Sequence, residues 1–307
     1  MFDIIGKKWF YFLFSGLIII PGLFSLILWG IKPSIDFTGG TLVEVQSSKF
    51  KAGALGASSS EEIKKIVELE KIEISSIQKS GEDTFLLRFK SFEKDQNQKL
   101  QEEFKKQFGE VRELRFETVG PTIGKETEEN AFKSVVLASL AIITYITLAF
   151  RKIPKPYSSI KFGICAVVAL IHDVLVIVGL FSIFGHFFKV EVDSLFITAL
   201  LTIMGFSVHD TIVVFDRIRE NLKKMPDLSF TQVVNESIIQ TLARSLSTSL
   251  TVIFTLFALL LFGGESIRWF VVALLIGITS GTYSSIFNAA PLLVVWEEWG
   301  KEKIKLD

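Results

Sequence analysis

Six long, almost uncharged apolar runs constrain this chain more than any other feature of its sequence. A helix rises about 1.5 Å per residue, so about 20 apolar residues cross the roughly 30 Å hydrocarbon layer of a bilayer. The runs are Trp9–Ile31, Ser134–Phe150, Phe162–Phe184, Ser194–Phe215, Ser245–Phe262 with an extension back to Ser237, and Trp269–Trp296. A composition with 49% hydrophobic residues and 29 phenylalanines agrees with extensive lipid contact. We therefore expect a polytopic α-helical membrane protein with six transmembrane helices.

The first run follows Lys7 and Lys8 and is longer than the apolar core of a signal peptide. No small-x-small cleavage site follows it, so we interpret it as an uncleaved transmembrane helix, with a removed signal peptide as the alternative. Pro21 and Gly22 predict a kink within it.

The charges of the short connections predict how the chain is threaded through the membrane. Cations gather before the first run, after the second, after the fourth and after the sixth: Lys7, Lys8, Arg151, Lys152, Lys155, Lys161, Arg217, Arg219, Lys223, Lys224, Lys301, Lys303 and Lys305. With six spans, all these places fall on one side, which the positive-inside rule makes cytoplasmic. We expect a multi-pass membrane protein with both termini cytoplasmic. The plan has a cytoplasmic N-terminus and first helix at 1–31, an extracytoplasmic domain at 32–130, helices two to six at 131–299 with cytoplasmic loops 151–161 and 216–236, and a cytoplasmic tail at 300–307.

The polar block after the first run has the pattern of a small α+β domain. Strands are predicted at Thr41–Gln46, Ile72–Ile77, Thr84–Phe89 and Val111–Val119, and helices from about Ser59 and over Lys94–Phe108. Ser80-Gly81-Glu82-Asp83 predicts the hairpin turn between the second and third strands. The order β-α-β-β-α-β is that of a ferredoxin-like domain. Without a nucleophile dyad, a phosphate loop or a His/Cys cluster, it is expected to bind or to move, not to catalyse.

Asp210 is the first charge in the fourth apolar run, and more apolar residues follow it. An acid in the middle of a membrane helix costs roughly 2.5–3.5 kcal/mol, so such residues usually face a partner or a hydrated path. Counting back from Asp216, Asp210 lies roughly 9 Å inside the membrane. The alternative is a helix that ends at His209. His209 and Asp210 form one of two His-Asp pairs.

Arg244 is the natural partner of Asp210. It lies roughly 12 Å past Glu236 on the next helix, a depth in the membrane similar to that estimated for Asp210. A polar stripe at helical spacing contains Thr241, Arg244, Thr248, Thr251 and Thr255. This stripe indicates a hydrated seam; simple packing, or Arg244 as an anchor at the membrane entry, is the alternative. We predict an ion relay of Asp210 and Arg244, with Asp173, His209 and Thr248 as weaker candidates.

Asp173, in the second pair His172-Asp173, lies roughly 18 Å beyond Lys161, near the middle of the bilayer. A helix-packing contact is the alternative to a functional role. Neighbouring residues of a helix point about 100° apart, so neither pair is expected to hold a metal. Small residues on the last run, Gly277, Gly281, Ser280, Ser284, Ser285 and Asn288, favour close helix packing. No catalytic site, and no metal or cofactor, is expected, and the zero net charge gives no reason to expect nucleic acid.

Four motifs resemble the SecF family, a relative of SecD and of the RND superfamily. They are Asp36-Phe37-Thr38-Gly39-Gly40-Thr41 after the first span, Val119-Gly120-Pro121-Thr122-Ile123-Gly124-Lys125-Glu126 before the second, the stretch 208–221, and Asn235-Glu236-Ser237 with Arg244-Ser245-Leu246-Ser247-Thr248. The resemblance covers nearly the whole chain in order. The family's ion-relay acid and arginine fall on Asp210 and Arg244.

The resemblance implies a non-enzymatic subunit of the bacterial Sec protein-export machinery, located in the bacterial cytoplasmic (inner) membrane. It also implies use of the proton or sodium gradient during late preprotein translocation. It implies a SecD-like subunit as partner, besides the SecY/SecE/SecG translocon, membrane lipid, the unfolded preprotein and, further, YajC and YidC. With six spans and one small domain, the chain is expected to be a stand-alone SecF-like subunit. The alternatives are half of a small-molecule RND-type exporter and a scaffold without ion movement.

The glycine-rich motifs at both ends of the polar domain suggest a hinge. Glycine adopts backbone angles that other residues resist. We predict that Asp36, Gly39, Gly40, Gly120, Pro121 and Gly124 transmit helix movement to the domain, with two ordinary turns as the alternative.

Overall fold

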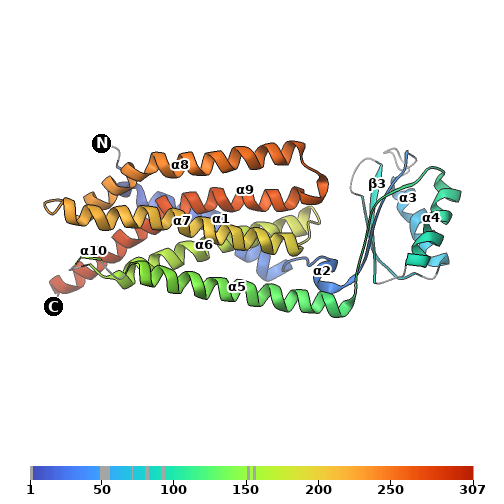
Figure 1. Cartoon of the computed structure of the whole chain (residues 1–307), viewed down its shortest axis with the longest axis horizontal. Helices are drawn as coiled ribbons and strands as arrows, with labels where there is room; N and C mark the ends of the chain where they lie inside the picture. Colours follow the sequence, from blue (N-terminus) through green and yellow to red (C-terminus); the bar gives the residue numbers. More distant parts are fainter. Residues whose placement is uncertain are drawn as a thin grey trace. The chain divides into compact units, whose positions relative to one another are not determined.

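The computed structural model describes residues 3–48, 56–70, 72–79, 83–90, 94–150, 153–154 and 157–306, and it forms two compact units (Figure 1). One unit contains Met1–Lys32 and Lys133–Asp307, and the other contains Pro33–Phe132. The second unit differs by a few residues at each end from the extracytoplasmic domain expected at 32–130.

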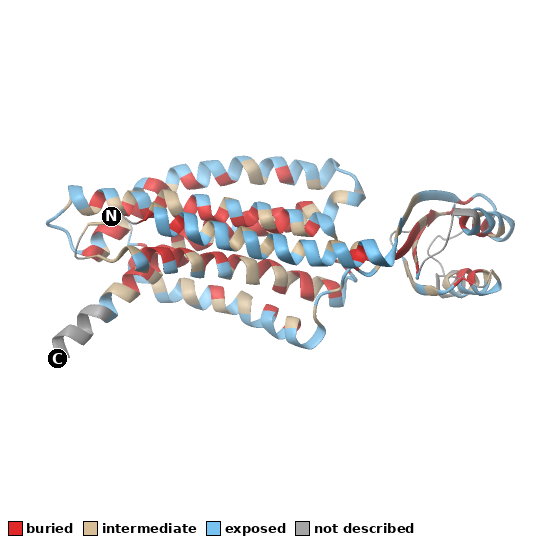
Figure 2. Ribbon diagram, turned by 60° about the horizontal axis from the view of Figure 1, so that its bottom comes forward, coloured by how far each residue is buried: buried red, intermediate tan, exposed pale blue. Residues whose placement is uncertain are grey.

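Within the described residues, six helices are long and apolar enough to cross a membrane, as the sequence predicted. The helical segments are η1 (Ile5–Lys7), α1 (Lys8–Trp29), α5 (Pro121–Ala149), α6 (Ser159–Phe187), α7 (Ser194–Lys224), α8 (Phe230–Phe262), η3 (Glu265–Ile267), α9 (Arg268–Ser284), the π-helical η4 (Ser285–Ala289) and α10 (Ala290–Leu306). The sixth span, Arg268–Trp299, runs through α9, η4 and α10. In the most apolar part of α6, of α7 and of the sixth span, half of the residues or more are buried. In α1, α5 and α8 most residues are not buried (Figure 2).

Three helices extend well beyond the predicted apolar runs. The second span begins at Pro121 instead of Ser134, because proline suits the first position of a helix and the polar turns that follow continue it. The fourth span continues to Lys224, which excludes the alternative of a helix that ends at His209. The fifth span begins at Phe230, where Ser229 and Gln232 form a reciprocal capping box.

Helix α1 passes through Pro21 as one continuous helix, and its small residues pack against α6. A Cβ atom on Gly22 would lie 3.0 Å from the Gly179 backbone, and one on Gly179 would lie 2.8 Å from that of Gly22. Ser25 and Ser182 hydrogen-bond across the same crossing at 2.7 Å. Small residues therefore set this close approach.

Two ion pairs connect α1 and α6 to the last turns of the sixth span, and a side chain of α8 binds the segment that precedes α1. Lys8 pairs with Glu298 at 2.5 Å, and Lys161 pairs with Glu297 at 2.7 Å. The Asn235 side chain accepts hydrogen bonds from the backbone N–H groups of Ile4 and Ile5, at 2.8 and 3.2 Å. These contacts bring the segments at the start and end of the chain to the same end of the helical unit (Figure 1).

The second unit has one antiparallel sheet of four strands in the order β2-β3-β1-β4. Its elements are α2 (Ile35–Thr38), β1 (Gly40–Gln46), α3 (Gly56–Leu69), β2 (Ile74–Lys79), β3 (Thr84–Phe89), α4 (Lys94–Phe108) and β4 (Arg112–Val119). Apart from the short α2, this is the predicted order of strands and helices. The ferredoxin-like name stays a prediction. A core from both layers, including Val43, Val67, Leu87 and Phe104, lies between sheet and helices. Residues 80–82 of the predicted hairpin turn lie outside the described residues.

Candidate functional site

The Asp210 carboxylate lies inside the helical unit, where α7, α8 and α9 meet. Its residue is 2% exposed. The hydroxyls of Ser249 on α8 and Thr282 on α9 each lie 3.4 Å from Asp210 Oδ2 and 2.6 Å from one another. Among the described residues these two long hydrogen bonds are the ones that Asp210 accepts, so they stabilise a negative charge weakly.

The predicted ion pair of Asp210 with Arg244 is wrong for this chain by itself, because in its described part no ion pair joins the two residues. Ser249, which faces Asp210, follows Arg244 by five positions on α8, and at 3.6 residues per turn this places the two side chains about 140° apart. Arg244 is accordingly exposed on the opposite face of its helix. The spacing from Glu236 predicts how far along α8 Arg244 lies, but it does not predict toward which side of the helix its side chain points.

Three threonines of the predicted polar stripe share the exposed face of Arg244. Thr248, Thr251 and Thr255 each donate to a carbonyl of their own helix, at 2.7 to 2.9 Å, and only Thr241 is buried. We call Arg244, Thr248, Thr251 and Thr255 the outer stripe of α8. It faces away from the core of this chain, so it is a surface for lipid or for another protein.

His209 is exposed although its neighbour Asp210 is buried, as expected for adjacent positions on a helix. Among the described residues, no group of three or more His, Cys, Asp or Glu side chains is arranged to hold a metal ion.

Asp173 on α6 accepts hydrogen bonds from side chains of α7 and α9, and its residue is 0% exposed. The hydroxyls of Ser207 and Ser284 donate to its Oδ2, at 2.5 and 2.7 Å. Ser280 donates to Oδ1 at 2.7 Å, and His172 Nδ1 lies 3.0 Å from the same oxygen. Sequence reasoning treated Ser280 and Ser284 as packing residues and missed Ser207. The sequence did contain a signal for this cluster: Ser280 and Ser284 lie one helical turn apart in the sixth span, and the acid Asp173 lies in the third.

The sixth span opens into its π-helical turn directly after this cluster. Ser285 hydrogen-bonds to Thr211 of α7 at 2.8 Å, and the Asn288 amide donates to Ser15 of α1 at 2.8 Å. Closely packed glycines precede it: a Cβ atom on Gly281 would lie 2.9 Å from that of Ser207. π-turns occur often at functional sites, and this one borders the cluster around Asp173.

The predicted hinge motifs meet within the second unit. Gly39 has a φ of +71° and Gly40 a φ of +126°, angles that side chains resist. A Cβ atom on Gly39 would lie 2.8 Å from Pro121 Cα. Pro121 and Gly124 belong to the first turn of α5, and the Ser34 hydroxyl accepts from the Asp36 backbone at the start of α2. The hinge itself stays a prediction.

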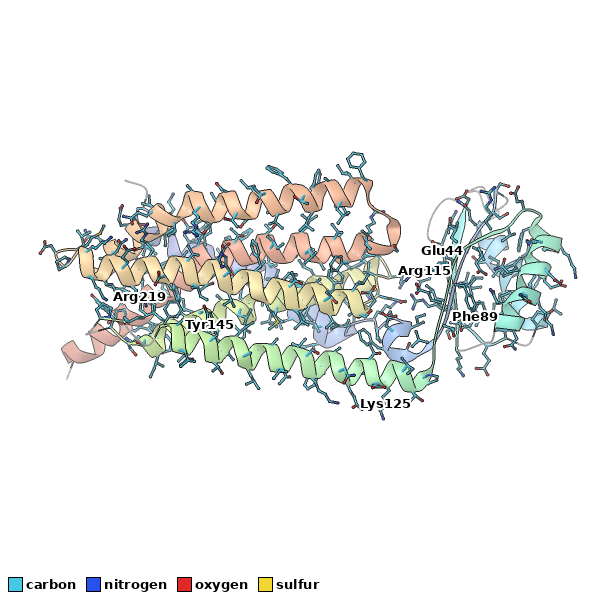
Figure 3. The ribbon with its side chains drawn as sticks, viewed as in Figure 1. Glu44, Phe89, Arg115, Lys125, Tyr145 and Arg219 are labelled. Carbon is cyan, nitrogen blue, oxygen red and sulfur yellow. The ribbon has the colours of Figure 1, made fainter. Side chains whose placement is uncertain are left out.

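Other polar side chains of the motifs hold the ends of α7 and α8 together. The Asn221 amide donates to Ser237 and Gln240, at 2.9 and 3.1 Å. Within α7, Arg219 pairs with Asp216 near the end of the helix (Figure 3). In the motif that begins α5, Lys125 lies on the first turns of the helix (Figure 3).

Comparisons with known proteins agree on one family. Residues 99–299 match the family described as "Protein export membrane protein SecD/SecF, C-terminal", and residues 25–49 match the "SecD/SecF GG Motif". The protein translocase subunit SecF of Thermobaculum terrenum is 47% identical over 303 residues, covering 97% of this chain and 94% of the relative. The protein translocase subunit SecDF of Bacillus subtilis is 35% identical over 99% of this chain and 39% of its own length.

The crystal structure of SecDF from Thermus thermophilus superposes with a TM-score of 0.82 at 32% identity. The match covers 97% of this chain and 39% of that one. The chain thus spans about two fifths of the SecDF proteins that it matches.

Proposed function

The chain belongs to the SecD/SecF family and has a SecF-like role in Sec protein export, and we propose that it couples ion movement across the membrane to preprotein translocation through Asp210 and Arg244. The observation that carries this proposal is a buried membrane acid with two long hydroxyl contacts, next to a helix whose opposite face exposes a membrane-depth arginine. Both groups are costly in lipid, which favours a functional reason for each.

A SecD-like subunit is the partner that the SecDF relatives support, since they carry a SecF-like part in a longer chain. We propose that it covers the outer stripe of α8. Arg244 has no acid partner among the described residues of its own chain, so the covering subunit would supply a carboxylate. The threonines are bonded to their own helix and leave a narrow, weakly polar surface that another helix can approach.

In the proposed relay, α8 links the two residues. One face of α8 presents Ser249 to Asp210, and the opposite face carries Arg244. A proton or sodium ion reaching Asp210 would remove the charge that Ser249 and Thr282 face, and would change how α8 packs on α7 and α9. Arg244 on the same helix would then shift against its acid in the partner. A charge crossing 100 mV supplies roughly 2.3 kcal/mol, about the cost of one charge in mid-membrane.

The chain is a multi-pass membrane protein. We propose that both termini are cytoplasmic, that the Pro33–Phe132 unit is extracytoplasmic, and that the membrane is the bacterial inner membrane. The expected contacts with SecY/SecE/SecG, YajC, YidC and an unfolded preprotein, and the lack of a catalytic site, stand as parts of the same proposal.

The deciding experiment uses inverted vesicles that contain this chain and its SecD-like partner. Uptake of an unfolded preprotein should rise with an imposed proton or sodium gradient and lose that rise in Asp210→Asn. Dye efflux under the same gradients tests the small-molecule exporter, which the translocase names of the relatives disfavour. Gradient-driven dye efflux without preprotein uptake would overturn the proposal.

A further inference from the structure

The acid that the proposed relay leaves unused, Asp173, has the more complete set of oxygen neighbours. Its two carboxylate oxygens and the hydroxyls of Ser207, Ser280 and Ser284 bring five oxygen atoms together from α6, α7 and α9. Each hydroxyl lies 2.5 to 2.7 Å from the carboxylate. Oxygen ligands of this kind suit hard cations.

In the part of the chain that the structure describes, no lysine or arginine side chain pairs with the carboxylate of Asp173. Among the described residues, His172 is the sole basic side chain that pairs with Asp173. His172 Nε2 is buried without a hydrogen-bond partner. The three serine hydroxyls around Asp173 are neutral, so a cation from outside the chain would stabilise its buried carboxylate.

The number and type of ligands specify the charge of that cation. One carboxylate neutralises a single positive charge, and serine hydroxyls add ligands without adding charge. A divalent ion would leave an uncompensated charge in a site that is 0% exposed at Asp173. The hydroxyls donate to the carboxylate here and can rotate to turn their lone pairs toward an ion.

We propose that Asp173, Ser207, Ser280 and Ser284 form a binding site for a monovalent cation, Na⁺, between α6, α7 and α9. The site is separate from Asp210, whose hydroxyl partners are Ser249 and Thr282. It does not depend on the proposed relay, although α7 and α9 contribute to both. His172 Nδ1 contacts the carboxylate at Oδ1, 3.0 Å away.

The test measures binding of ²²Na⁺ to the purified full-length chain, together with its thermal unfolding at constant ionic strength as NaCl replaces choline chloride. Sodium should bind saturably and raise the unfolding temperature, whereas potassium should act weakly. Asp173→Asn should lose both effects. Ser280→Ala should raise the half-saturating sodium concentration by about tenfold, which corresponds to about 1.4 kcal/mol of lost ligand interaction.

Two matched variants make the outcome specific. Thr251→Val removes a hydroxyl from the outer stripe of α8 and should leave sodium binding unchanged. Asp216→Asn, at an acid outside this site and outside the proposed relay, should also keep it. Because this assay measures sodium binding and not export, failure of the relay and failure of this site are told apart. Should Asp173→Asn not fold, Ser280→Ala carries the test. The proposal is overturned if sodium, potassium and choline give the same unfolding temperature, or if Ser280→Ala and the unchanged chain bind sodium equally.

Discussion

Gly124 lies so close to Gly39 that a methyl group on Gly124 would be 2.7 Å from the Gly39 backbone nitrogen and 2.9 Å from the Phe37 carbonyl oxygen. Both contacts are with backbone, which cannot move aside as a side chain can. We predict that Gly124→Ala destabilises the Pro33–Phe132 unit by about 1–3 kcal/mol through overpacking. Chemical denaturation of that unit within the full chain, followed with a local fluorophore, would measure the change.

The matched control for this glycine is Gly120, four positions earlier. A Cβ atom there would meet no other atom within 4 Å, so Gly120→Ala should leave stability unchanged. If the hinge prediction holds, Gly124→Ala also impairs export while membrane insertion stays intact. Equal stability and export for the two variants would remove both the packing and the hinge argument.

The threading of the chain gives a second prediction. With buried Cys165 replaced by alanine, cysteines at Lys79 or Gln98 should react with an impermeant thiol reagent added to spheroplasts. Cysteines at Ser158 or Lys223 should react only after the membrane is opened. The charge distribution is the physical reason, because cations stay on the cytoplasmic side. Labelling of Ser158→Cys before lysis would contradict the proposed orientation.

The sequence predicted the six spans because lipid forces each crossing to be apolar and helical, so the signal is local. It missed the start of α5 at Pro121 because the first three turns of that helix are polar and carry no hydrophobic period. The strands could be predicted for a similar reason. Along most of Thr84–Phe89, apolar and polar side chains alternate, and this alternation matches the burial pattern of the strand.

The arrangement of the buried acids was less accessible from sequence. That Asp173 and Asp210 sit in apolar runs could be seen, and the structure buries both. Which hydroxyls surround them depends on how α6, α7, α8 and α9 are rotated against each other. Rotation of this kind is set by contacts such as that of Gly281 with Ser207, which no pattern within one helix specifies. The roles of both acids in ion movement stay predictions.

The outer stripe of α8 gives a third prediction. Replacing Arg244 with methionine keeps its length and removes its charge, so the carboxylate that we propose in the SecD-like subunit would be left unpaired. Gradient-dependent export should be lost while the chain still inserts. Thr255→Val on the same stripe is the control and should export normally, since its hydroxyl is bonded to its own helix. Disulfide cross-linking from Thr251→Cys to cysteines in the partner would map the contact; its failure throughout the partner's helices would contradict the placement.

Asp210→Asn is the most direct test of the relay. The substitution keeps the size of the side chain and its ability to accept from Ser249 and Thr282, but the amide cannot take up a proton or balance a sodium ion. We expect the variant to assemble with its partner and to export preprotein at the rate seen without a gradient. One charge moving through 100 mV changes an equilibrium by at most roughly 50-fold, so the lost increment should lie within that bound. Asp216→Asn, which removes an acid paired with Arg219 nearer the end of the same helix, is the matched control and should keep the gradient response. Since Asn retains the packing of Asp210, a normal gradient response in Asp210→Asn would mean that this buried acid serves α7–α9 packing alone, and the coupling site would have to be sought elsewhere.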